Sequence, residues 1–148
     1  MKKVTKALKQ KMIDIAHANG LKLHFIKRKS YGGMYDDTKK LITVSLVTQK
    51  GYMLNALNLV SCFCHELGHA AQDKLQTKLT KIVNNRLRPE TRYFISKFRL
   101  QYEYEADKFG SKFKTWAFPE IKGEYLSGYP IENKKETIEY LLKHYEGR

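Results

Sequence analysis

The sequence predicts a single α+β domain, and three observations lead to this prediction. The chain has 148 residues, a length that suits one hydrophobic core. Hydrophobic residues make up 42% of it and aromatic residues 12%, which indicates a folded globule rather than a disordered tail. Apolar residues recur at helical spacing over long segments and alternate with polar residues over short ones. The sequence has no internal repeat, low-complexity tract or Pro/Gly-rich linker, so the domain is expected to span residues 1–148.

The first third of the chain is expected to form one helix and two strands. Residues 3–19 have apolar side chains at helical spacing, and the Asn19-Gly20 pair at their end is typical of a helix stop. Residues 21–26 alternate between apolar and polar, as in a half-buried strand. Residues 41–47 are rich in β-branched side chains and predict a second strand, while the glycine and aspartate pairs between them indicate turns. The apolar helix positions are Val4, Leu8, Met12 and Ile15.

The period becomes helical again over residues 53–73. Gly68, in the middle of this segment, costs about 1 kcal/mol relative to Ala inside a helix. With Ala70 and Ala71 beside it, it predicts that another element approaches this helix closely. The apolar stripe of the segment consists of Val60, Cys64, Leu67, Ala71 and Leu75.

The second half of the chain is expected to contain a long helix, a loop and a last helix. Residues 74–88 are basic and poorly periodic, which predicts a loop with some helix. Pro89 followed by Glu90 is typical of a helix start. Glycines and prolines over residues 118–130 indicate an irregular loop, and Asn133 with Glu136 resembles a capping box that opens the last helix. The stripe expected to face the core along the long helix is Phe94, Phe98, Tyr102, Ala106, Phe109 and Phe113.

The charge of the chain is strongly positive and unevenly distributed. The formal net charge is +13, and residues 1–50 contain 12 Lys/Arg against 3 acids, whereas residues 101–148 contain 8 against 9. A basic front half is typical of a nucleic-acid partner, of an acidic protein substrate or of a well-solvated surface. No aromatic-interleaved nucleic-acid motif or zinc-finger spacing accompanies the charge, which favours the solvated surface.

Two further features indicate a cytoplasmic protein. The apolar runs are too short to cross a bilayer, and no apolar segment follows the basic start as a signal peptide requires. Cys62 and Cys64, the only cysteines, would point about 200° apart on a helix. They are therefore expected to be small buried side chains rather than a disulfide or a shared zinc site.

The most specific motif of the chain is His65-Glu66-Leu67-Gly68-His69. Residues i and i+4 lie on one face of a helix, about 6 Å apart along its axis, so both imidazoles can bind one ion. Glu66 lies roughly 100° further round, where it misses the metal but reaches a water bound to it. This is the H-E-x-x-H arrangement of zinc hydrolases, and it predicts a metal site with Glu66 as general base.

A catalytic zinc usually takes three protein ligands, so a third is needed. Asp73 continues the i+4 series but lies about 12 Å along the helix from His65, which is too far. Glu103 and Asp107 share one helix face, with Glu105 pointing elsewhere, so Glu103 is expected to bind the metal and Asp107 to accept the free ring N–H of a ligand histidine. The alternative for this pair is a solvated acidic face. The lone histidines, expected on the surface or in the core, are His17, His24 and His144.

Together, His65-Glu66-x-x-His69 and Glu103-x-x-Ala106-Asp107 resemble the gluzincin branch of zinc metallopeptidases. Residues 33–45, which run into a strand before the zinc helix, are similar to those of small ImmA/IrrE-like peptidases. Those peptidases usually carry Asn in place of Asp107, an aspartate that resembles the larger gluzincins instead. The similarity covers about residues 10–115, and residues 116–148 are expected to add a loop and a C-terminal helix.

The resemblance implies a zincin-like fold in which a small sheet packs on the zinc-binding helix, followed by the long glutamate-bearing helix. It implies one catalytic Zn²⁺ held by His65, His69 and Glu103, with Glu66 passing the proton of a metal-activated water to the leaving amine. It also implies that the strand at residues 41–47 lies near the cleft and pairs with an extended substrate. Tyr35, Tyr125 and Tyr129 are candidates for stabilising the oxyanion.

The function expected from this sequence is that of a zinc-dependent metallopeptidase that cuts a specific protein target, for example a regulator. Two alternatives stay open. One is a basic zincin protease recruited to nucleic acid and acting on bound proteins, whose binding would fall steeply with salt. The other is a non-catalytic binding module that keeps zinc as a structural staple, although such a site has no need of a general base at Glu66.

Overall fold

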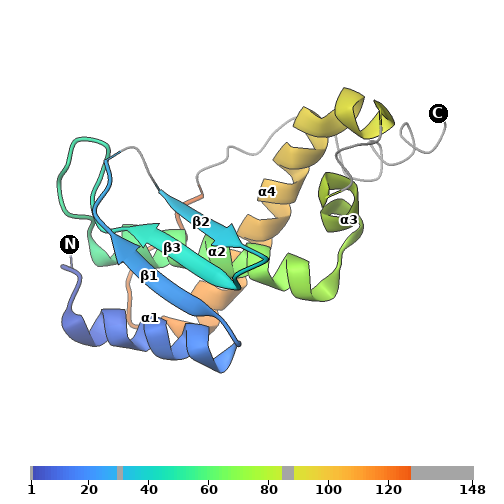
Figure 1. Ribbon diagram of the computed structural model, residues 1–148. Coiled ribbons are helices and arrows are strands. Elements are labelled where there is room, and N and C mark those ends of the chain that lie inside the picture. Colours follow the sequence, from blue (N-terminus) through green and yellow to red (C-terminus); the bar gives the residue numbers. More distant parts are fainter. Residues whose placement is uncertain (1, 30–31, 85–88, 128–148) are drawn as a thin grey trace.

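The computed structural model describes residues 2–29, 32–84 and 89–127, and for residues 89–97 it describes the backbone alone. Over these residues the fold is α+β, with four helices and one three-stranded mixed sheet (Figure 1). In chain order the elements are α1 (Lys6–Ala18), β1 (Lys22–Ile26), β2 (Gly33–Asp36), β3 (Leu41–Ser45), α2 (Ala56–Leu75), α3 (Lys78–Asn84) and α4 (Pro89–Ala117).

The sheet has the strand order β1-β3-β2, with β1 parallel and β2 antiparallel to β3. The expected strands at residues 21–26 and 41–47 are confirmed with slightly shorter bounds. The turn expected at the aspartate pair is confirmed over residues 37–40, where Asp36 Oδ1 accepts hydrogen bonds from the Thr38 and Lys39 amides at 3.0 and 3.1 Å. The short edge strand β2, which runs from Gly33 to Asp36, was not expected from the sequence. Since β3 is paired on both sides, its backbone cannot accept a substrate strand, and the expectation that residues 41–47 do so is wrong. Within the described residues, β2 is an edge strand of the sheet that packs against α2, and its outer side has no strand partner.

Helix α2 is the central element of the fold. Asn55 caps its start by accepting a hydrogen bond from the Asn58 amide at 2.8 Å, and Gln76 ends it in the left-handed conformation with φ of 51°. This confirms the helix expected at residues 53–73, shifted two or three residues toward the C-terminus. The apolar stripe was only partly right, because α2 is buried on more than one side: Phe63 is fully buried whereas Leu75 is 63% exposed.

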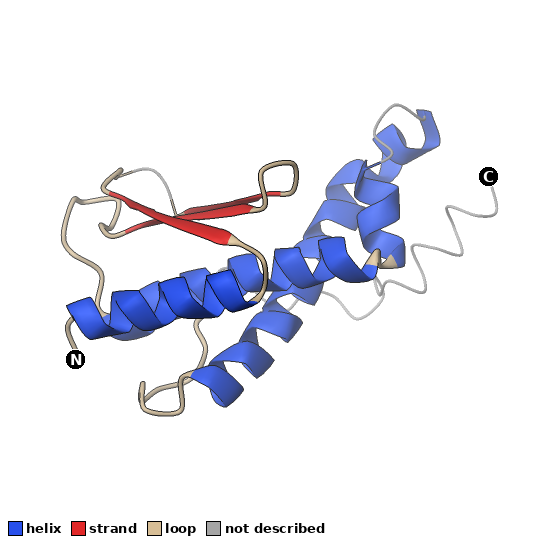
Figure 2. Ribbon diagram, turned by 60° about the horizontal axis from the view of Figure 1, so that its bottom comes forward, coloured by secondary structure: helices blue, strands red, loops and turns tan. Residues whose placement is uncertain are grey.

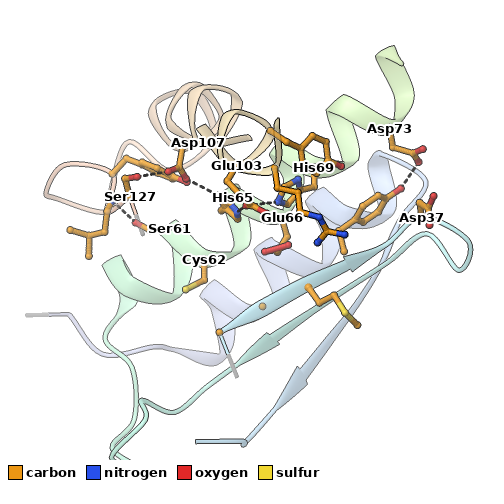
Figure 3. A pocket seen from close by; sticks show the side chains of 18 of the residues that line it. Asp37, Ser61, Cys62, His65, Glu66, His69, Asp73, Glu103, Asp107 and Ser127 are labelled. Carbon is orange, nitrogen blue, oxygen red and sulfur yellow. Dashed lines mark hydrogen bonds and ion pairs between the residues drawn. The ribbon is translucent and has the colours of Figure 1, made fainter. Parts of the chain in front are cut away.

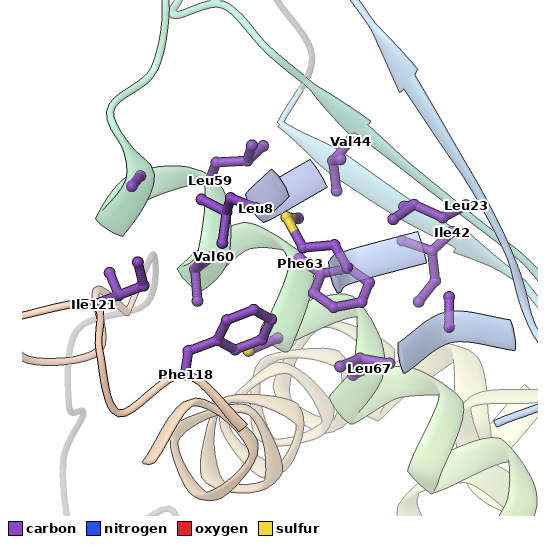
Figure 4. Close-up of a cluster of buried hydrophobic side chains, with 14 of the residues drawn as sticks. Leu8, Leu23, Ile42, Val44, Leu59, Val60, Phe63, Leu67, Phe118 and Ile121 are labelled. Carbon is purple, nitrogen blue, oxygen red and sulfur yellow. The ribbon is translucent and has the colours of Figure 1, made fainter. Parts of the chain in front are cut away.

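The sheet packs on one side against α1 and α2 (Figure 2). The main core lies between these layers and continues to Phe118, just after α4, whose ring meets that of Phe63 edge-on at 6.2 Å between centroids (Figure 4). Thr5 caps α1 at its start, so the helix expected at residues 3–19 is confirmed with tighter ends. Of the expected α1 positions, Leu8 and Met12 are buried, whereas Val4 and Ile15 are half-buried and Ala16 is buried in addition.

Helix α4 crosses α2 at very close range. A Cβ atom added at Gly68 would lie 2.1 Å from the carbonyl oxygen of Ala106, and one at Gly110 would lie 2.9 Å from that of Cys64. The close approach expected at Gly68 is thus confirmed, and α4 is the element that makes it. Because the two backbones nearly touch, side chains one turn away on each helix are brought face to face.

The second half of the chain forms α3, α4 and a loop. Residues 74–88 contain the short helix α3, which packs with Leu79 and Val83 against Phe98 of α4. The long helix begins at Pro89 as expected, and residues 118–127 form the irregular loop. The helix expected after Asn133 lies outside the described residues. None of the helices in the described part of the chain has the length and apolar character needed to cross a bilayer.

Candidate metal centre

Three side chains from α2 and α4 converge on one point. His65 and His69 both turn Nε2 toward the same oxygen of Glu103, Oε2, at 2.7 and 2.9 Å (Figure 3). The ligand atoms of the three residues all lie within 4.8 Å of one another. The α2–α4 crossing at Gly68 and Ala106 sets this meeting, because Glu103 lies three residues before Ala106 on the helix. The three residues proposed as ligands from the sequence are brought together here.

His65 is held by a carboxylate on its other ring nitrogen. Its Nδ1 donates to Asp107 Oδ1 at 2.6 Å, which is the contact expected of Asp107. Burial would lower the pKa of His65, but the hydrogen bonds to Asp107 and Glu103 outweigh it and raise the pKa to about 10. Without a metal, the imidazole is therefore a cation between two carboxylates.

His69 is held by a neutral amide. Its Nδ1 donates to Gln72 Oε1 at 2.8 Å, and Gln72 in turn donates from Nε2 to the Tyr102 carbonyl at 2.7 Å and to Glu105 Oε1 at 2.9 Å. Gln72 is fully buried. Gln72 was not expected in the site from the sequence, and neither was Glu105, whose carboxylate fixes the amide that supports His69.

The charge of Glu103 follows from the two rings. Burial raises the pKa of Glu103, but the hydrogen bonds from His65 and His69 prevail and lower the pKa to about 2. The Tyr102 ring lies over His69 with 4.7 Å between centroids, which closes that side of the cluster. The carboxylate is therefore ionised over the whole physiological range and suited to bind a cation.

Glu66 lies beside the cluster but does not join it. It is only 6% exposed, and in residues 2–29, 32–84 and 98–127 no donor forms a hydrogen bond with its carboxylate. Burial raises the pKa of Glu66, although His69 and His65 nearby counteract part of this effect. The side chain passes beneath β2, where a Cβ atom at Gly33 would lie 3.2 Å from Glu66 Cγ. Glycine at position 33 therefore leaves room for Glu66 under the edge strand.

The donor set fits zinc. Two imidazole nitrogens and one carboxylate oxygen are the ligands of many catalytic zinc sites. An ion about 2 Å from each donor requires them about 3.3 Å apart, so the separations to Glu103 need to widen by only about half an ångström. Both Nδ1 atoms are already occupied by acceptors, which leaves both Nε2 atoms for the metal.

Several other candidates lie outside the cluster. Asp73 accepts hydrogen bonds from Tyr35 at 2.8 Å and from Lys40 at 2.6 Å, in agreement with its exclusion as a ligand. Tyr125 donates its hydroxyl to Asp107, so this oxyanion candidate supports the cluster instead. Tyr129 and His144 lie outside the described residues, and His17 and His24 are exposed.

The cluster opens into a cleft of about 880 Å³ between β2, α2, α3 and α4. Among the described residues, five carboxylates and one arginine, Arg99, line it, in a chain whose net charge is +13. Cys62 also faces the cleft, and the buried Cys64 does not. The lining residues on which the site depends are Gly33, Tyr35, His65, Glu66, His69, Tyr102, Glu103, Asp107, Leu126 and Ser127.

Comparison of the chain with protein-family models, with curated proteins and with solved structures finds no match.

Proposed function

We propose that this protein is a zinc-dependent metallopeptidase of the zincin type that hydrolyses a peptide bond in a protein target. His65, His69 and Glu103 would hold the ion, with Asp107 and Gln72 fixing the two rings. The observation that carries the proposal is Glu66. A carboxylate that is buried, free of hydrogen bonds within the described residues and on the wall of the same cleft is what a general base requires.

The environment of Glu66 suits both halves of a proton transfer. Bound zinc would lower the pKa of a coordinated water toward about 7 and polarise the scissile carbonyl. Glu66 accepts the proton of the attacking water and then delivers it to the leaving amine. Burial raises the pKa of this carboxyl, which brings its affinity for the proton closer to that of the water it serves.

The edge strand β2 gives the substrate a place to bind. Gly33 and Tyr35 line the cleft, and β2 has no strand partner on that side in the described part of the chain. An extended peptide that adds to this edge by backbone hydrogen bonds would lie across the cleft, above Glu66 and the cluster. An unfolded or extended segment of a protein is therefore the substrate class that the cleft favours.

The two alternatives have less support from the site. A structural zinc staple has no use for a buried carboxylate held free beside its ligands, and Glu66 is one. Nucleic acid would be repelled by the five carboxylates of the cleft, so recruitment to it would depend on lysines elsewhere on the surface.

Glu66→Gln tests the proposal. The zinc-loaded protein is incubated with a complex peptide library, and new termini are counted by mass spectrometry. Cleavage is expected in wild type, and kcat/KM should fall about 10²–10⁴-fold in Glu66→Gln. The exposed Asp14→Asn, on α1 away from the cleft, makes the same carboxylate-to-amide change and should cut like wild type. Equal cleavage by Glu66→Gln, or cleavage that persists in excess chelator, would reject the mechanism.

A further inference from the structure

The chain after α4 returns to the metal centre as a strap, which we define as residues 118–127. Its start is anchored in the core by Phe118 and Ile121, and the buried Lys114 donates from Nζ to the Ile121 carbonyl at 3.0 Å. Gly123 then turns the chain with φ of 112°, a conformation that favours glycine. The strap next meets α2, where the Leu126 amide donates to Ser61 Oγ at 3.1 Å.

Two hydroxyls of the strap bind the carboxylate that holds His65. Tyr125 donates to Oδ1 of Asp107. Ser127 donates to Oδ2 of the same carboxylate (Figure 3). Oδ1 also receives His65 Nδ1 at 2.6 Å, so the strap acts on both oxygens and the histidine on one. Asp107 is 9% exposed, and little water can replace these donors.

The two hydroxyls remove the freedom of the Asp107 carboxylate to rotate about its terminal bond. A carboxylate held by His65 alone would take the ring with it as it turned, whereas one held on both oxygens gives the ring a fixed direction. Some residues do not bind the metal but hydrogen-bond to one of its ligands. Their removal usually weakens metal affinity 10–100-fold. The strap would therefore affect metal affinity through Asp107 and His65, without contacting the ion itself.

We propose that Tyr125 and Ser127 are positioning residues of the metal centre, which hold Asp107 so that His65 is preset for the ion. The inference rests on the proposed zinc site but not on peptidase activity. The strap also forms part of the cleft wall through Leu126 and Ser127. One segment thus shapes the cleft and supports the metal, although it lies outside the region that carries the sequence motif.

Zinc affinity of the full chain tests this inference. Metal-stripped protein competes for zinc with a chromophoric chelator of known affinity. We expect Tyr125→Phe and Ser127→Ala each to weaken zinc binding several-fold, and the double variant to weaken it about 10–100-fold. Ser127→Thr keeps the hydroxyl and should bind zinc as tightly as wild type, unlike Ser127→Ala. The matched control is Tyr52→Phe, which removes a phenol hydroxyl from a side chain that is exposed and does not line the cleft, and it should leave zinc affinity unchanged.

A double-mutant cycle separates positioning from a general loss of structure. In an Asp107→Ala background the two strap changes should have no further effect on zinc affinity, because they act through Asp107. Zinc affinity within twofold of wild type in the double variant, or an undiminished loss in the Asp107→Ala background, would overturn the inference while leaving the zinc site in place. Absence of zinc binding in wild type would overturn the proposed function together with it. If the double variant does not fold, Tyr125→Phe alone is the test: a several-fold loss of zinc affinity supports the inference, and wild-type affinity overturns it.

Discussion

His65 and His69 stand one turn apart on α2 and turn the same nitrogen to Glu103, yet different parts of the chain hold them. Behind His65 stands the charged Asp107, tied to the strap that follows α4. Behind His69 stands the neutral Gln72, tied to the backbone of α4 at Tyr102. We call these sets the His65 arm (His65, Asp107, Tyr125 and Ser127) and the His69 arm (His69, Gln72, Glu105 and the Tyr102 carbonyl).

Asp107 supports His65 by its charge, whereas Gln72 supports His69 only by the position of its hydrogen bonds. Asp107 stabilises a positive charge on His65 and raises its pKa, so the His65 arm responds to pH and to anything that moves the strap. Gln72 carries no charge and lies fully buried between two helices, so the His69 arm responds to helix packing. Each arm can therefore be weakened by a change that leaves the other intact.

The largest effect is expected at Gly68, on which both arms depend. Gly68→Ala would place Cβ 2.1 Å from the Ala106 carbonyl oxygen and force α2 and α4 apart. In an open helix this change stabilises by about 1 kcal/mol, but here we expect a loss of about 3 kcal/mol or more in the free energy of unfolding. Urea denaturation measures it, with Gly32→Ala, where the added Cβ meets nothing within 4 Å, as control. Normal stability in Gly68→Ala would contradict the crossing.

Loss of Asp107 should affect metal more than fold. Asp107→Ala removes the acceptor of His65, so zinc affinity should fall about 10–100-fold. Competition with a chromophoric chelator gives the value, and circular dichroism checks that the helices persist. If this variant bound zinc as tightly as wild type, the His65 arm would have no role in the site.

Loss of Gln72 should affect the stability of the fold more than zinc affinity. Gln72→Met keeps the volume but removes the hydrogen bonds to His69, to the Tyr102 carbonyl and to Glu105. The Tyr102 carbonyl and the half-buried Glu105 carboxylate lose a donor, and the buried Gln72 position loses its hydrogen bonds, so we expect the free energy of unfolding to drop by about 1–3 kcal/mol. Zinc affinity should fall less than tenfold. A larger effect on zinc than that of Asp107→Ala would erase the distinction between the arms.

The smallest effect concerns the pH dependence of the metal-free protein. The pKa of His65 rises from 6.5 to about 10 on folding, so its stabilising contribution is complete below about pH 6.5 and is lost as the pH rises toward 10. The pKa of Glu103 falls from 4.5 to about 2, so its contribution is complete above about pH 4.5 and is lost as the pH falls toward 2. Urea denaturation with chelator present should show the alkaline loss in wild type and Gln72→Met, and a smaller one in Asp107→Asn. The same alkaline slope in all three proteins would contradict the assignment.

The sequence predicted the residues of the cluster better than their supports. His65, Glu66, His69, Glu103 and Asp107 follow from helical spacing, which depends only on local geometry. Gly68 also predicted that another element crosses this helix closely, because a glycine inside a helix lowers its stability and close packing can offset that loss.

What the sequence could not predict depends on how distant segments meet. Gln72 is an ordinary polar residue on α2 until α4 brings the Tyr102 carbonyl and Glu105 against it. Ser127 comes near Asp107 only because Gly123 turns the strap back along α2. The strand β2 begins at the second glycine of one pair and ends at the first aspartate of another, residues that local rules assign to turns, and pairing with β3 makes it a strand.

The central claim is that His65, His69 and Glu103 bind one zinc ion while Glu66 stands free of it. Titration of the metal-stripped protein with zinc, followed by calorimetry, tests this most directly. We expect one ion per chain in wild type and in Glu66→Gln, and affinity reduced at least 100-fold in Glu103→Ala. No binding in wild type, or equal affinity with and without the Glu103 carboxylate, would contradict the claim.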